Sequence, residues 1–217
     1  MNMDTPRTAV QTPAPLCFAK LFKTAFDGQD LKSLRDRLIT QSRSNPVDAA
    51  SALLSLSTIE QLLDDQPSGL QRQAEALSLH RLYRSSWPAS PNALRVVAFK
   101  AAGEIAINTP IEFLLEGADV VLYSLYVMPG LPLPEVPDHD IAIVTVGESD
   151  RNRPVIEEIE RLVQTWPCPV LNRPDRAFQL TREGMYRLLK TTGSKPVESF
   201  ATESRGVRLK PPEAWSG

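Results

Sequence analysis

The sequence predicts a mixed α/β protein, with helices in the first half of the chain and a small parallel β-sheet in the second. Between residues 31 and 83, apolar side chains recur at the three- and four-residue spacing of helices. After residue 94, short and nearly continuous apolar runs alternate with helical segments. Such alternation is typical of buried parallel strands that are joined by helices.

The chain is expected to contain five regions. Residues 1–26 are predicted to be a disordered leader, because its start is rich in Pro and Thr. The regions that follow are a helical region at 27–85, a linker at 86–93, an α/β domain at 94–190 and a flexible tail at 191–217.

Three helices are predicted in the helical region. The first covers residues 31–39. The second begins after Asn45, which is a good N-cap, with Pro46 at the first helical position. The segment "QPSG" is predicted to end that helix as a turn. The third helix, "LQRQAEALSLHRLYR", then forms a hairpin with the second and has Leu82 and Tyr83 at its far end.

Four strands are predicted in the α/β domain, with the sequences "LRVVAFKA", "ADVVLYSLYV", "DIAIVTVGE" and "CPVLN". A short helix, "TPIEFLLEG", follows the first strand. Thr109 and Glu112 have the spacing of a capping box around Pro110. An amphipathic helix, "RPVIEEIERLVQTW", follows the third strand. This order predicts a sheet with helices on both faces.

The composition gives no sign of nucleic acid or membrane as a partner. Hydrophobic residues make up 42% of the 217 positions and charged residues 23%, which is ordinary for a globular protein. The net charge of -2 gives no reason to expect nucleic acid or an anionic membrane as a partner. No apolar run approaches the roughly 20 residues that span a bilayer. With only Cys17 and Cys168 and no recognisable signal peptide, a cytoplasmic protein is expected.

Candidate ligand-binding residues lie in the loops that follow the strands, because ligands of such sheets bind beyond the carboxyl ends of the strands. The loop "VGESDRNRP" comes directly after a buried strand and places polar groups at a helix entry. The loop "NRPDR" offers an arginine fork for an anion. The candidates are Asn108, Gly147, Glu148, Asp150, Asn152, Asn172 and Arg173. The alternative, that they only cap helices or form turns, stays open.

The sequence supports no catalytic residue and no metal site. No loop matches a GxGxxG or P-loop pattern. No arrangement of Ser, Cys or His residues makes a credible triad, and no metal-ligand spacing is present.

Several segments together resemble bacterial tetratricopeptide-repeat proteins with a C-terminal ATP-grasp-type module. They include "ALSLHRLYR", "AAGEIAINTPIEFLLEGADVVLYSLYV" and "PVLNRPDRAFQLTREGMYRLL", and the resemblance covers roughly residues 31–189. It implies that the hairpin is a tetratricopeptide-like unit and that the sheet is a Rossmann-like pre-ATP-grasp domain. The ATP-binding lobes of that family have no match here. The resemblance therefore implies no cofactor for this chain, and ATP and Mg²⁺ only if an ATP-grasp module completes it.

Three functions follow from these observations. The favoured one is a non-catalytic module that binds a small molecule or a partner protein. The second is the substrate side of an ATP-dependent carboxylate–amine ligase, whose activity another chain would complete. The third is a helical scaffold that binds a protein partner or self-associates through its hairpin, because one hairpin is fewer than the repeats that a solenoid needs. Whether the chain takes part in an enzyme is left open.

Overall fold

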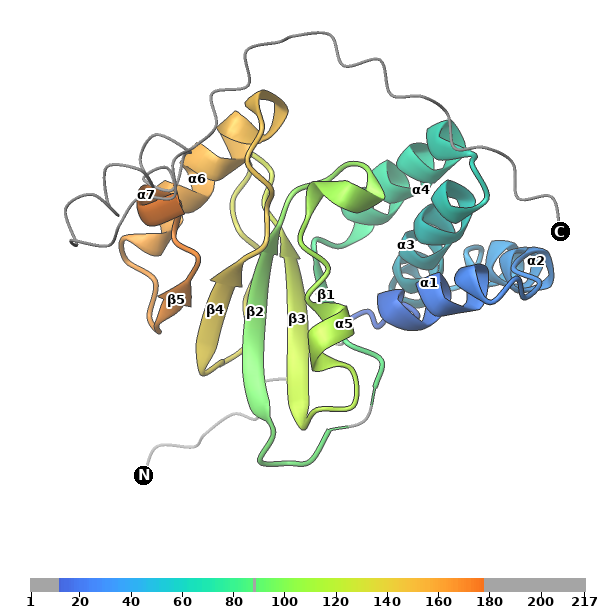
Figure 1. The fold of residues 1–217 in the computed structure, drawn as a ribbon, viewed down its shortest axis with the longest axis horizontal. Coiled ribbons are helices and arrows are strands. Elements are labelled where there is room, and N and C mark those ends of the chain that lie inside the picture. Colours follow the sequence, from blue (N-terminus) through green and yellow to red (C-terminus); the bar gives the residue numbers. More distant parts are fainter. Residues whose placement is uncertain (1–11, 88, 178–217) are drawn as a thin grey trace, which may run out of the picture. The chain divides into compact units, whose positions relative to one another are not determined.

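A computed structural model describes residues 12–87 and 89–177. The chain divides into two units, residues 1–177 and 178–217, and all described residues belong to the first. The mixed α/β prediction is confirmed, since helices pack with a five-stranded, mostly parallel sheet (Figure 1). The predicted tail at 191–217 lies outside the described residues. No helix in the described ranges has the length and apolar character needed to cross a bilayer.

The sheet has the strand order β1-β3-β2-β4-β5. Strands β2, β3, β4 and β5 run parallel to one another, and β1 pairs antiparallel with β3 at one edge. The strands are β1 Leu82–Arg84, β2 Leu94–Lys100, β3 Val120–Tyr126, β4 Ile141–Val144 and β5 Val170–Leu171. Because β3 and β4 lie on opposite sides of β2, the chain changes direction between β2 and β4. This point is the topological switch point, where sheets of this type bind ligands.

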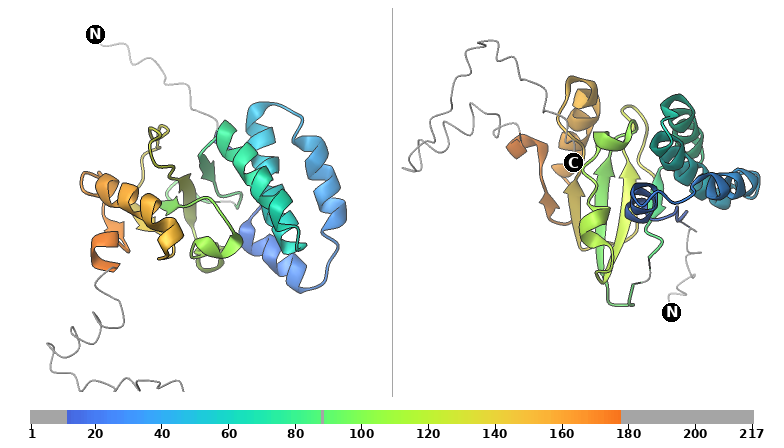
Figure 2. Two further views of the ribbon diagram at one scale, coloured as in Figure 1. Left: turned by 90° about the horizontal axis from the view of Figure 1, so that it is seen from above. Right: turned by 45° about the vertical axis from the view of Figure 1, so that its right-hand side comes forward.

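Helices cover both faces of the sheet, as predicted. Alternate side chains of β2 point to opposite faces, as they must in a strand. Val97 and Phe99 belong to the cluster that contains Ile159 of α6 (Arg153–Val163). Val96 and Ala98 pack instead with Ile111, which directly precedes α5 (Glu112–Leu115). Figure 2 shows α6 and the N-terminal helices on opposite sides of the strands.

The N-terminal helices have a core of their own. They are α1 Phe18–Phe26, α2 Lys32–Gln41, α3 Pro46–Leu62 and α4 Gln66–Leu79. Leu21, Leu38, Leu56 and Ile59 belong to one buried cluster of α1, α2 and α3. Helices α3 and α4 approach closely at Gly69, where a Cβ atom would lie 2.6 Å from Gln61 Cγ. Only glycine fits this position without a shift of its neighbours.

One part of the predicted leader is a helix. Residues 18–26, which were predicted to be disordered, form α1, and Ala19 and Leu21 are buried on it. The prediction was wrong here because it treated residues 18–26 like the Pro-rich residues before them, although they form a short amphipathic segment. That segment orders because it can bury its apolar side against α3.

The boundary between the second and third helices was also predicted wrongly. The segment "QPSG" opens α4 and does not end α3, because the Asp65 carboxylate accepts a hydrogen bond from Ser68 N at 3.2 Å. Pro67 lies in the first turn, where its missing N–H costs nothing. The turn itself falls at Asp64, which has a φ of 62°.

Two further local predictions fail for tertiary reasons. Leu82 and Tyr83 belong to β1 and not to a helix, and they pair with Leu125 and Ser124 of β3. The predicted capping box does not form, since α5 has no side-chain cap and Glu112 is paired with Lys100.

The short elements that remain are η1 Ile105–Ile107, η2 Asp150–Asn152 and α7 Pro174–Ala177.

Candidate functional site

A hollow of about 250 Å³ lies at the switch point, between the loop after β2 and the loop after β4. We call it the switch-point crevice. It is lined by Glu104, Ala106, Ile107, Gly147, Glu148, Ser149, Arg151 and Asn152. The two loops are joined directly, because Gly147 N donates a hydrogen bond to the Ile107 carbonyl oxygen at 2.9 Å. The crevice therefore has a fixed backbone floor.

Three of the predicted ligand-binding residues line this crevice. At Gly147, a Cβ atom would lie 3.2 Å from the Ile107 carbonyl oxygen, so any side chain at this position would crowd that oxygen. Asn152 is buried, and its Nδ2 donates to the Gly147 carbonyl oxygen at 2.6 Å. Glu148 is exposed, and its carboxylate forms no salt bridge or hydrogen bond with any residue in the described ranges. Asn152 thus holds the loop, and Glu148 is free to meet a ligand.

The predicted residues Asn108 and Asp150 have their polar groups engaged within the chain. Both ends of the Asn108 amide bond to the backbone of Ala101, each at 2.8 Å, so this side chain closes the loop after β2. Asp150 lies beside the crevice and accepts a hydrogen bond from Arg153 at 3.0 Å, with its side chain 98% exposed. Neither residue lines the crevice.

The predicted residues Asn172 and Arg173 lie at the end of β5, away from the crevice lining. Asn172 has a φ of 53°, and its Nδ2 donates to the Val144 carbonyl oxygen at 3.4 Å. Arg173 pairs with Asp175 at 3.2 Å. Their positions therefore tie the end of β5 to the sheet and to the start of α7.

Glutamines of the helical hairpin hold the other wall of the crevice, and the sequence analysis missed them. Gln73 of α4 donates to the Gly103 carbonyl oxygen at 3.1 Å and accepts from Gly103 N at 2.6 Å. Gln61 of α3 accepts a hydrogen bond from Ile105 N at 3.0 Å. Gln73 could have been noticed in the sequence, because it is a polar residue within the apolar stripe of α4. In the structure its side chain is buried. The helices therefore position the loop after β2.

A second and larger hollow, of about 640 Å³, adjoins α4. We call it the α4 hollow. Its lining includes Leu70, Leu77, Arg81, Met128 and Leu131. Arg151 lines both hollows and forms a salt bridge with Glu104 at 2.9 Å. The two hollows are therefore neighbours on either side of one exposed ion pair.

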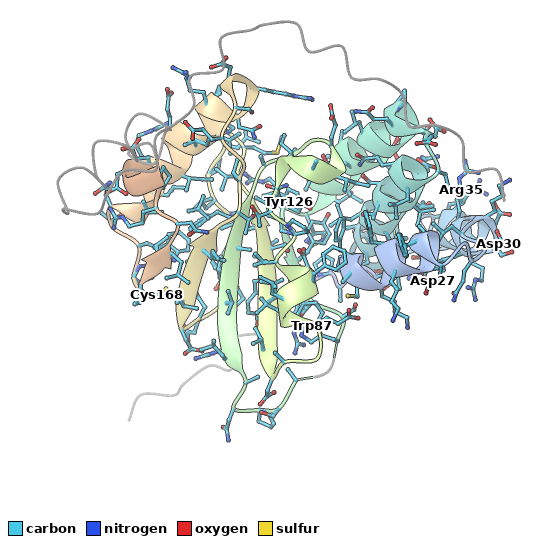
Figure 3. All side chains as sticks on the ribbon, viewed as in Figure 1. Asp27, Asp30, Arg35, Trp87, Tyr126 and Cys168 are labelled. Carbon is cyan, nitrogen blue, oxygen red and sulfur yellow. The ribbon has the colours of Figure 1, made fainter. Side chains whose placement is uncertain are left out.

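A buried polar cluster lies at the ends of β2 and β3. Lys100 ends β2 and forms an ion pair with Glu112 of α5. Tyr126 is the register partner of Lys100 on β3, and it lies between the strand ends and the helices (Figure 3). Two small cavities, of about 70 Å³ and about 50 Å³, border all three residues. Glu112 Oε2 is buried without a hydrogen-bond partner among the described residues.

The electrostatics of this cluster favour a structural role. Burial alone would lower the pKa of Lys100, but the Glu112 carboxylate and the Tyr126 hydroxyl together outweigh it, so the pKa of Lys100 is raised. Burial raises the pKa of Tyr126, and the charge of Lys100 offsets only part of this rise. Both groups are therefore protonated at neutral pH and are poorly placed to accept a proton. The sequence contained one sign of this cluster: Lys100 is a charged residue at the end of an apolar strand.

Within the described ranges, no group of three or more His, Cys, Asp or Glu side chains could hold a metal ion. No match was found when the chain was compared with models of protein families, with curated proteins and with solved structures.

Proposed function

We propose that this protein is a non-catalytic module that binds a small organic molecule in the switch-point crevice. The observation that carries the proposal is the hollow of about 250 Å³ between the loops after β2 and β4. This is where parallel sheets of this order bind ligands. Its two walls are fixed by Asn152 and Gln73, so little ordering of the backbone would accompany binding.

The test is a fragment screen followed by nuclear magnetic resonance of the backbone amides. Compounds that bind should shift the amides of residues 104–107 and 147–152. Ala106→Phe would fill the crevice without removing a hydrogen bond and should abolish these shifts. Ala118→Phe, at an exposed position before β3, is the matched control and should bind normally. If no compound moves these amides, or if Ala106→Phe binds as well as the parent protein, the proposal is wrong.

We also propose the family relationship that the resemblance implies, with α3 and α4 as one tetratricopeptide-type unit and the sheet as a pre-ATP-grasp-type domain. The parallel strand order and a crevice at the carboxyl edge support it. In this proposal ATP and Mg²⁺ belong to a separate ATP-grasp chain, and this chain supplies the substrate side. Calorimetric titration with magnesium-ATP should show no binding, and saturable micromolar binding would contradict the assignment.

A second candidate function, a scaffold that self-associates, is favoured by an apolar patch on α1 and α5. Phe26 is 85% exposed and Leu114 is 80% exposed. Beside them, the rings of Phe22 and Phe113 contact each other edge to face, with centroids 5.6 Å apart. Patches of this kind often mark interaction surfaces. Light scattering should then show a dimer that Phe26→Ser and Leu114→Ser dissociate, whereas a monomeric parent protein would remove this candidate.

A further inference from the structure

We infer that the α4 hollow is a binding site for an organic carboxylate with an apolar body, and that Arg81 recognises the carboxylate. This site is distinct from the switch-point crevice, and it would remain if the crevice bound nothing. Three features of the hollow carry the inference: an unpaired cation, an apolar wall and a suitable size.

The first feature is the state of Arg81. This arginine is partly buried, and it forms no salt bridge with any residue in the described ranges. Its Nη2 donates to the Pro132 carbonyl oxygen, and its Nη1 is buried without a hydrogen-bond partner. A buried donor without a partner is unfavourable, and more so when it is charged. An anion in the adjoining hollow would stabilise the charge of this guanidinium, and this does not require contact with the buried Nη1.

Arg81 differs in this respect from the other arginine of the hollow. Arg151 is already paired with Glu104, so that pair adds no net charge to the hollow. The hollow therefore carries one unpaired positive charge, that of Arg81. It matches a carboxylate, which carries one negative charge and accepts two parallel hydrogen bonds from a guanidinium. A phosphate with two negative charges would be matched less well.

The second feature is the apolar wall. Leu70, Ala74 and Leu77 line the hollow and follow one another at helical spacing, so they form one stripe along α4. Met128 and Leu131, from the loop after β3, also line it. An apolar body would be removed from water between these side chains. The flexible thioether of Met128 can adapt to ligands of different shape.

The third feature is size. The volume of about 640 Å³ falls within the range of about 300–1,000 Å³ that is usual for small-molecule sites. Such sites combine a mainly apolar lining with a few polar groups that orient the ligand. In the α4 hollow, Arg81 is the group placed to give that orientation.

The experiment uses the full chain and three probes of similar length: octanoate, 1-octanol and octylammonium. Octanoate should shift the methyl resonances of Leu77 and Met128, and it should bind at least about tenfold more tightly than octanol, as expected for hydrogen bonds to a charged group. Octylammonium should not bind. Arg81→Gln should weaken octanoate binding by about tenfold or more. Arg37→Gln, the same change of charge on α2, should leave binding unchanged.

Two results would overturn the inference. One is equal binding of octanol and octanoate to the parent protein, a comparison that needs no variant and so does not depend on how Arg81→Gln folds. The other is a set of octanoate shifts confined to residues 147–152, with Leu77 and Met128 unmoved. The second result would leave the proposed crevice site intact. Conversely, octanoate binding that survives Ala106→Phe would support the α4 hollow as a separate site.

Discussion

Replacing Lys100 by methionine should be among the most destabilising single changes in this protein. Lys100 and Glu112 are each only 7% exposed, and they form an ion pair at the end of the central strand. Glu112 Oε2 has no hydrogen-bond partner among the described residues, so Lys100 is the group that compensates this carboxylate. Lys100→Met would leave a buried charge with neither oxygen paired.

The magnitude follows from the burial of both partners. Breaking a buried ion pair by removing one partner costs about 3–5 kcal/mol of unfolding free energy. A domain has about 5–15 kcal/mol in total, so the change would remove a large fraction of the stability. Replacing both partners, with Lys100→Met and Glu112→Met together, removes both charges and should cost far less, because apolar substitution of a whole buried pair is often neutral or stabilising.

Urea denaturation followed by circular dichroism compares the parent protein, Lys100→Met and the double variant. The single variant should unfold at a much lower urea concentration, and the double variant should recover most of the loss. The exposed pair of Arg95 and Asp140, with side chains 44% and 42% exposed, is the control. Arg95→Met should cost no more than about 1 kcal/mol. If Lys100→Met costs as little as Arg95→Met, the pair is solvated and the reasoning is wrong.

Three further predictions test the packing and the titrating groups. Gly69→Ala should cost about 1–3 kcal/mol of unfolding free energy, because its Cβ would lie 2.6 Å from a side-chain carbon of α3. An unchanged urea midpoint would contradict this. Hydrogen bonds from Ser90 lower the pKa of Asp119, so its contribution to stability is present above the ordinary value of 3.8 and is lost as the pH falls below it. Asp119→Asn should therefore flatten the acid side of the stability profile, and an equally steep profile would count against it. Burial, assisted by Glu116, raises the pKa of the Cys17 thiol, so its alkylation near neutral pH should be slower than that of free cysteine and faster in Glu116→Gln. Equal rates in the two proteins would exclude the effect of Glu116.

The regular elements could be predicted where the signal is local. The strands β2, β3 and β4 are apolar runs, and α6 has a clear amphipathic period, so each was found at nearly its observed place. Strand β1 was missed because a strand of three residues carries too little periodicity to separate it from a helix end. Its pairing with β3 is a long-range contact that no local pattern encodes.

The candidate site was predicted in part for the same reason. The loop from Gly147 to Asn152 follows a buried strand directly, so its place at the carboxyl edge could be predicted from the sequence. Asn108 also lies after a strand, but its amide closes the loop. Arg81 and Gln73 belong to the helical half, and their positions beside the sheet depend on how the helices pack against it.

The hydrogen bonds of Gln73 indicate that the helical half is more than a cap over the sheet. A helical cap that only shields a domain would meet it through apolar side chains. Here the amide of Gln73 forms two hydrogen bonds with Gly103, whose φ of 149° is a conformation that glycine adopts most readily. Gly103 lines the α4 hollow, and Glu104 after it lines the switch-point crevice. The helices therefore fix the walls of both hollows, and the two proposed binding sites depend on the helical half as much as on the sheet.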